Sequence, residues 1–191
     1  RSLETIAAIV RFLGRSDDNG NYNYPTLQTL TEGVLTFADI IRHIDQILDK
    51  YGRIKDSAST RLAEIRSQLQ KAEGSVSRTL NNILRAAQSE GLIEKDVTPT
   101  LRDGRLVVPI APALKRRIKG IVHDESSTGK TVFVEPNEVV EANNRIRELE
   151  ADERREIIVI LTEFTKLVRP HIDDIINAYR LLAEVDFIRA R

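Results

Sequence analysis

The residues whose order most resembles a chemical motif are Ser127-Thr128-Gly129-Lys130-Thr131. A Gly-Lys-Thr sequence ends the phosphate-binding loop in which backbone amides and a lysine hold a nucleotide. That motif also needs a glycine five residues before Gly129, where this chain has Asp124. It needs a helix after the loop, whereas Val132-Phe133-Val134 is typical of a strand. The sequence therefore predicts a hairpin loop here and not a nucleotide site.

The three histidines are a second possible source of chemistry. His43, His123 and His171 are far apart in sequence and lack the spacing of metal ligands. His123-Asp124-Glu125-Ser126 could form a proton relay, but a hydrogen-bonded turn is the simpler interpretation. No nucleophile elbow or paired-carboxylate pattern is present. We therefore predict no catalytic, cofactor-binding or metal-binding residue in this chain.

The basic segment Leu114–Gly120 is the part of the sequence that most clearly suggests a function. Between Val97 and Pro136, seven basic residues stand against four acidic ones. The candidate nucleic-acid-binding residues are Lys115, Arg116, Arg117 and Lys119, with Arg102, Arg105 and Lys130. Such a patch could contact phosphates with an affinity that depends on salt. No aromatic residue is interleaved with it, so base stacking by this segment is not supported. The alternative is that the charges only keep edge strands soluble, and the residues leave both interpretations open.

Composition narrows the class of protein. The chain has 191 residues, of which 30% are charged and 5% aromatic, a balance typical of helical proteins. Its formal net charge is zero, so any attraction to nucleic acid must come from a local patch. No cysteine is present, which excludes disulfides and thiolate metal sites. No apolar run approaches the roughly 18 residues of a membrane span, so we expect no membrane partner. Because the chain begins at Arg1 without an initiator methionine, we expect a piece of a longer protein.

The elements that must position the basic segment are strands. Val97–Pro136 is the only stretch with a β pattern, and Asp103-Gly104 within it predicts a two-residue hairpin turn because both positions need positive φ. The strand formers are Leu106, Val107, Val108, Ile110, Ile118, Ile121, Val122, Val132, Phe133 and Val134. About 40 residues are too few for a sizeable core. We therefore predict a small β insertion carried by long helices.

Two long helices are expected to carry the insertion. The first helix runs over about Ala58–Ser89 and is capped by Ser57 or Ser59. The second helix begins after Pro136. It kinks or ends near Arg169 because of Pro170. The first has a near-heptad apolar stripe: Leu62, Ile65, Leu69, Ala72, Val76, Leu80, Ile83 and Ala87. The second has two stripes: Val139, Ala142, Ile146 and Leu149, then Ile157, Leu161, Phe164, Val168, Ile172, Ile175, Tyr179 and Leu182.

The predicted fold is mainly α. The long helices lie antiparallel in a coiled-coil-like pair with the β insertion at the far end. Shorter helices at Ser2–Leu13, Thr26–Gly33 and Phe37–Leu48 form a bundle at the near end.

Several segments carry a family resemblance. GRIKDSAST, LAEIRSQL, LRDGRLVVPI and KGIVHDESSTGKTVFVEPNEVVEANNRIRELEADERREI resemble the MutS family. The resemblance is closer to its second bacterial type, a paralogue associated with suppressing recombination. It covers nearly the whole chain and is most specific at DGRLVVPI and GIVHDESSTGKTVFVEP.

The resemblance implies a domain plan. Residues 1–57 and 169–191 would belong to a helical core, 58–96 and 137–168 to the ascending and descending helices of a lever, and 97–136 to a clamp-like insertion. The parent protein would be a cytoplasmic, ATP-dependent homodimer. Its ATPase domain, which binds ATP and Mg, would lie outside this chain, and so would a nuclease domain.

The resemblance also implies a function without catalysis in this chain. The module would contact branched or duplex DNA through its backbone, in DNA repair and suppression of homologous recombination, and link that contact to the ATPase. A second possibility is binding to stalled ribosomes through ribosomal RNA, since both targets are phosphate polymers. A third is a purely architectural dimerisation arm.

Overall fold

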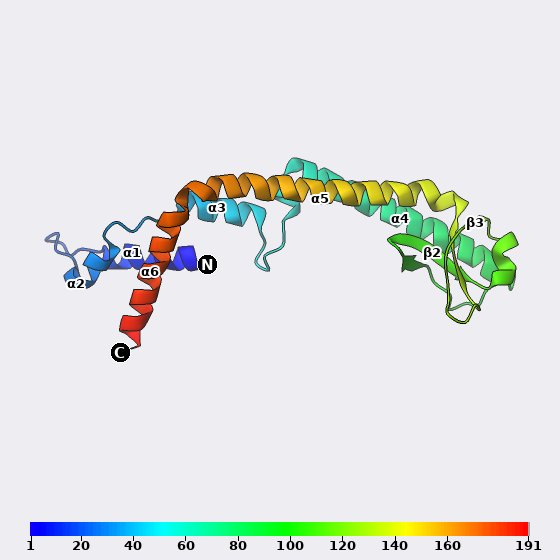
Figure 1. Ribbon diagram of the computed structural model, residues 1–191, viewed down its shortest axis with the longest axis horizontal. Helices are drawn as coiled ribbons and strands as arrows, with labels where there is room; N and C mark the ends of the chain where they lie inside the picture. Colours follow the sequence, from blue (N-terminus) through cyan, green and yellow to red (C-terminus); the bar gives the residue numbers. More distant parts are fainter. Residues whose placement is uncertain (191) are drawn as a thin grey trace. The chain divides into compact units, whose positions relative to one another are not determined.

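The computed structural model describes residues 1–190 and divides the chain into two compact units. One unit is Arg1–Ala58 together with the chain from Ile157 onward, and the other is Ser59–Glu156. The chain is mainly helical with one small antiparallel sheet of four strands (Figure 1). The expectation of a mainly α protein with a small β insertion is confirmed at this level.

The first unit is helical throughout its regular elements. It contains α1 (Ser2–Leu13), α2 (Pro25–Gln28), α3 (Ala38–Ile47), α6 (Ile172–Arg189), the end of α5 (Val140–Val168), and the 3-10 helices η1 (Thr29–Thr31), η2 (Asp56–Ala58) and η5 (Arg169–His171). Its core is formed by Ile6 of α1, Phe37 and Ile40 at the start of α3, and Ala178 and Leu181 of α6.

The stripe predicted from Ile157 to Leu182 is confirmed only in part. Phe164, Val168, Ile175 and Leu182 pack against the core of the first unit. Leu161, Ile172 and Tyr179 were expected beside them but are 43%, 49% and 46% exposed, while Ile160, Ala178 and Leu181 are buried. The predicted stripe continues across Pro170 with the spacing of one unbroken helix. The structure instead ends α5 at Val168 and inserts η5, as expected from Pro170, and this tighter turn changes the face that α6 buries.

The second unit pairs two helices in opposite directions. α4 (Thr60–Ser89) begins at Ser59, whose hydroxyl accepts the amide of Leu62 at 2.9 Å and so confirms the predicted cap. The contacts between α4 and α5 join Ser59 Oγ to Glu156 Oε1 (2.8 Å), Arg66 Nε to Glu153 Oε1 (2.7 Å) and Gln68 Oε1 to Arg145 Nη2 (3.1 Å). As the residue number rises on α4 it falls on α5, so these stretches are antiparallel.

The sheet follows α4 in the chain. It consists of β1 (Thr100–Arg102), β2 (Arg105–Ile110), β3 (Gly120–Glu125) and β4 (Val132–Pro136), in the spatial order β1-β2-β4-β3 and with every pairing antiparallel. The hairpin turn at Asp103-Gly104 is confirmed, with φ of 48° and 73°. Pro109 lies in β2 beyond the end of β1. On the β1 side of β2 its lack of an N–H therefore removes no hydrogen bond between strands.

One face of the sheet packs on the helices and supplies the core of this unit. Val108, Ile110, Val132 and Val134 meet side chains of α4, of the 3-10 helix η4 (Asn137–Val139) and of the start of α5. Those helix residues are Val76, Leu80, Leu84, Ala87, Val139 and Ile146, with the partly buried Leu69, Ala72 and Ile83 against them. The stripe predicted for the first long helix is confirmed by this cluster from Leu69 to Ala87, with Leu84 added, and Leu62 and Ile65 are buried outside the cluster. The sheet is small and needs the helices to cover it, as the length of the insertion implied.

Candidate nucleic-acid interface

The basic segment Leu114–Gly120 lies between β2 and β3 and is anchored by its apolar residues. The 3-10 helix η3 (Pro112–Arg116) contains Leu114, whose carbonyl accepts the amides of Arg117 (2.9 Å) and Ile118 (3.1 Å). Leu114 packs on the core of the second unit, and Ile118 is buried there at 8% exposure. Ile118 was expected to form strand, but it lies in this turn before β3.

The basic segment carries four cations at the surface of the second unit. Lys115, Arg116, Arg117 and Lys119 are all exposed. Within residues 1–190, none of them takes part in an ion pair. Four unpaired positive charges within five residues, on a backbone held by two buried side chains, form a site where an anionic polymer can be bound without breaking internal contacts.

Arg102 and Lys130 lie elsewhere on the same unit. The Arg102 guanidinium carbon is 4.2 Å from the centroid of the Phe133 ring, and its Nε is 3.7 Å from a carboxylate oxygen of Asp124. Arg102 thus covers the side of Phe133 opposite the helix-facing residues, which explains why Phe133 is buried outside the main core cluster. Lys130 is exposed in the loop between β3 and β4.

Arg105 has an internal partner. Its Nη1 donates to Glu135 Oε1 at 2.7 Å and its Nη2 donates to Asn144 Oδ1 at 2.7 Å. Glu135 is completely buried, so its charge requires compensation inside the protein. The Arg105 guanidinium is therefore engaged in internal contacts between β2, β4 and α5, unlike the four exposed cations of the basic segment.

A β-bulge completes this Glu135 network. The register between β3 and β4 shifts between Val122 and Asp124, which leaves His123 as the extra residue. His123 Nε2 lies 2.6 Å from Glu135 Oε2, and Asn143 Nδ2 donates both to Glu135 Oε1 (2.8 Å) and to the carbonyl of Leu106 (3.1 Å). An ionised carboxylate only accepts, so His123 donates through Nε2. The bulge thus directs the His123 side chain toward Glu135.

The Glu135 network has an electrostatic consequence. Burial alone would raise the pKa of Glu135. The hydrogen bonds donated by Asn143, His123 and Arg105, with the positive charge of Arg105, outweigh burial and hold this pKa below its ordinary value. This network was not predicted from the sequence. The one signal there is that Glu135 is the only charged residue in the apolar run VFVEP, and the structure buries all five residues of that run.

The remaining motifs have structural explanations. The loop at Ser126 closes a hairpin, with the Ser126 amide bonded to the Thr131 carbonyl at 2.8 Å, and strand β4 follows it, so the predicted hairpin is confirmed. His43 contacts the carbonyl of Asp39 at 2.8 Å, and the His171 ring packs edge-on against Phe37 with centroids 6.0 Å apart. No group of three or more metal-ligating side chains occurs in the described part of the chain.

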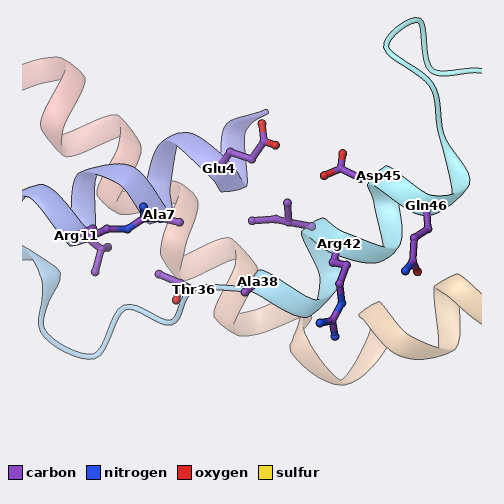
Figure 2. A pocket seen from close by; sticks show the side chains of 10 residues that line it. Glu4, Ala7, Arg11, Thr36, Ala38, Arg42, Asp45 and Gln46 are labelled. Atoms are coloured by element: carbon purple, nitrogen blue, oxygen red, sulfur yellow. The ribbon is translucent and has the colours of Figure 1, made fainter.

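An open groove of about 710 Å³ lies between α1 and α3 in the first unit (Figure 2). Glu4 and Arg11 line it from α1, and Arg42 and Asp45 line it from α3. Arg42 is paired with Asp39 at 2.7 Å. Two carboxylates and two guanidinium groups are among the side chains that line the groove, so its charge does not single out a ligand of either sign.

The structure therefore defines a helical protein in which antiparallel helices hold a small basic sheet. No family model matches the chain. A protein named Endonuclease MutS2 from Halalkalibacterium halodurans is 36% identical over 181 residues, which are 95% of this chain and 23% of that protein. Proteins of the same name from Finegoldia magna and Lacticaseibacillus paracasei are 38% and 35% identical over 99% and 100% of this chain.

This similarity over nearly the whole chain supports the assignment of the chain to the MutS2 family. The chain spans 23–24% of the length of these three relatives. In the part of the chain that the structure describes, no helix is long and apolar enough to cross a membrane.

Proposed function

We propose that this chain is the non-catalytic core, lever and clamp module of a MutS-type, ATP-dependent DNA-binding protein. In this proposal residues 58–96 and 137–168 form the lever, 97–136 the clamp, and the remainder the core. The parent would be a cytoplasmic homodimer that acts on branched or duplex DNA in repair and in suppression of recombination. Its ATP and Mg sites would lie in the three quarters of the relatives' length that this chain does not match.

One observation carries the proposal: the four unpaired, exposed cations of the basic segment. They are Lys115, Arg116, Arg117 and Lys119. Because the turn that presents them is anchored by Leu114 and Ile118, their charges stay together when a ligand binds. Lys130 is exposed on the same unit and could add a further phosphate contact, and Arg102 is partly available at its exposed side.

The chemistry of these side chains suggests how they would act. Lysine and arginine contact phosphate oxygens, which position a protein on a duplex without reading its sequence. No aromatic or amide side chain accompanies them in the basic segment. We therefore expect this contact to be independent of base sequence and to weaken with added salt.

The link to an ATPase rests on the continuity of the elements. β4 is followed without a loop by the 3-10 helix η4 (Asn137–Val139) and then by α5. Arg105 and Asn143 fasten the sheet to the start of α5 through Glu135. A displacement at the basic segment would therefore reach α5 directly, which is the property that a lever requires.

The proposal is tested by fluorescence anisotropy with a labelled four-way junction and a labelled duplex across a salt series. The test variant replaces Lys115, Arg116, Arg117 and Lys119 with Glu. We expect it to bind both DNAs at least about tenfold more weakly. The slope of the logarithm of the binding constant against the logarithm of salt concentration should become shallower by about 0.9 for each phosphate that the variant no longer neutralises. Unchanged affinity and slope would refute the proposal.

A matched control separates a local contact from total charge. Arg147, Arg154, Arg180 and Arg189 are exposed on α5 and α6, and changing all four to Glu alters the net charge by the same amount. This control should lose much less affinity than the test variant. Unlabelled ribosomes are added as a competitor, and stronger competition by ribosomes than by junction DNA would instead favour ribosomal RNA as the target of the same cations.

A further inference from the structure

A loop in the first unit, Leu48–Lys55, presents a tyrosine and basic residues; we refer to it as the tyrosine loop. Its sequence is LDKYGRIK, and it leaves the end of α3 beyond Gln46 (Figure 2). A bridge between Leu48 and Ile54 closes the loop. The amide of Asp49 donates to the Arg53 carbonyl at 2.9 Å, and the amide of Lys55 donates to the Ile47 carbonyl at 2.8 Å.

The tip of the tyrosine loop is fixed by its own backbone contacts. Asp49 Oδ1 accepts the amides of Tyr51 (2.8 Å) and Arg53 (2.9 Å). Gly52 has a φ of 79°, and its amide donates to the Asp49 carbonyl at 3.0 Å. These contacts determine the turn without any contribution from the Tyr51 ring.

Tyr51 is unusually open to solvent. At 72% exposure it is the most exposed large hydrophobic side chain in residues 1–190. Lys50 Nζ lies 4.9 Å from the centroid of its ring, which places a positive charge over one face. The high exposure leaves the remaining ring surface accessible to a flat ligand.

The charges around Tyr51 are positive. Lys50 and Arg53 are exposed, while Lys55 donates to the carbonyl of Asp45 and so helps to attach the loop to α3. Asp49 is the only acidic residue in the tyrosine loop, and one of its carboxylate oxygens already accepts two backbone amides. The surface offered to a ligand is therefore an exposed aromatic ring with Lys50 over one face and with the exposed Arg53 two residues further along the loop.

We propose that the tyrosine loop binds unpaired nucleotides. A base stacks on the open face of Tyr51, and Lys50 and Arg53 contact the phosphates on either side of it. Stacking does not select among bases, because each of them has a π face. A paired base is covered by its neighbours in the helix, so this site prefers single strands, frayed ends or open junction centres over intact duplex. It differs in this from the basic segment, for which we propose backbone contact alone.

The chain contains no tryptophan, so Tyr51→Trp creates a single fluorescent reporter at the site. Its emission is titrated with a twelve-residue oligothymidylate and with an oligouridylate of the same length. We expect saturable quenching by both, since the shared ligand is an unpaired base. Lys50→Ser with Arg53→Ser in the same reporter chain should raise the apparent Kd about tenfold.

The matched control is Tyr179→Trp, at a tyrosine of α6 that is 46% exposed. Its emission should stay unchanged over the same titration. Tyr51→Ala in the otherwise native chain should lower affinity for labelled oligothymidylate about tenfold, and Tyr51→Phe should restore it, because stacking needs the ring and not the hydroxyl.

Several results would overturn the inference. They are an absence of quenching, equal quenching in the α6 control, and a Kd insensitive to loss of Lys50 and Arg53. Equal quenching by a blunt duplex would indicate backbone binding without stacking, and equal quenching by polyglutamate would indicate an acidic protein partner. When the four Glu substitutions of the basic segment are combined with Tyr51→Trp in one chain, the oligonucleotide should still quench the tryptophan emission. Loss of quenching there would mean that the tyrosine loop is not a separate site.

Discussion

Glu135 is the residue whose environment departs most from what its chemistry prefers. A carboxylate with no exposed surface is stable only when charge and hydrogen bonds replace water. Arg105 and Asn143 donate to one of its oxygens, and His123 donates to the other. These partners come from three different elements, so the carboxylate fixes how β2, β3 and α5 lie around β4.

Replacing this carboxylate by an amide should be costly. Glu135→Gln removes the charge that Arg105 faces and places an amide NH₂ against donors. We expect the free energy of unfolding to fall by about 2–3 kcal/mol, measured as a lower midpoint in urea. Glu138→Gln is the control, because Glu138 is exposed nearby and should change the midpoint little. Equal midpoints for the two variants would show that the network adds nothing.

The lowered pKa of Glu135 also predicts a pH dependence. The folded pKa lies below the ordinary value of 4.5, so the stabilisation is fully present above about that pH. It is lost as pH falls through the lower, folded value, where the native carboxylate becomes protonated. Wild-type unfolding free energy should therefore fall more steeply with acid than that of Glu135→Gln, in urea titrations from pH 6 to pH 3. Parallel curves for both chains would contradict this assignment.

At the level of elements, the sequence predicted those with a strong local cause. Asp103-Gly104 determines its turn because two successive residues need positive φ, and Pro170 ends α5 because it lacks an amide. Features that depend on partners distant in sequence were missed. The burying face of α6 depends on the turn that η5 inserts, and the role of Arg105 depends on a glutamate thirty residues further along the chain.

The candidate site divides in the same way. The cations of the basic segment could be identified from sequence because they are adjacent in it. That Arg105 pairs with Glu135 could not be read from spacing, since strand register brings the two together. Tyr51 was overlooked because a single aromatic in a loop has no periodic signal, and only its 72% exposure distinguishes it.

Two glycines of the second unit should respond to alanine in opposite directions. A Cβ on Gly120 would lie 2.1 Å from the carbonyl oxygen of Glu135, so β3 and β4 would have to separate. A Cβ on Gly74, inside α4, would meet nothing within 4 Å. Gly120→Ala should cost about 2 kcal/mol or more, and Gly74→Ala should add about 0.5–1 kcal/mol, in urea unfolding. A neutral Gly120→Ala would mean that the strands approach less closely than described.

At the scale of the whole molecule, the chain contains two hydrophobic cores that share one helix. Leu80 belongs to the core of Ser59–Glu156 and Leu181 to the core of the other unit, while α5 contributes residues to both units. Each core is formed by side chains of its own unit. The two units should therefore differ in their response to a local cavity.

We predict that Leu80→Ala lowers the stability of its own unit by about 2–5 kcal/mol, as large-to-small changes in a core do. Hydrogen exchange followed by mass spectrometry should then accelerate in α4 and the sheet but stay near wild type in α1. Leu181→Ala is the reciprocal variant and should accelerate α1 and α6 instead. Uniform acceleration throughout the chain in either variant would mean that the units unfold as one.

The bulge at His123 has a consequence for self-association. A regular outer strand exposes a row of backbone groups on which a second molecule can extend the sheet. β3 is an outer strand of this sheet, and two of its aliphatic side chains, Ile121 and Val122, are 48% and 43% exposed. The extra residue interrupts the regular spacing of that row, and at the opposite border β1 has only three residues. We therefore expect the irregularity that directs an imidazole inward also to limit fibrous aggregation, and deletion of His123 to remove both effects together.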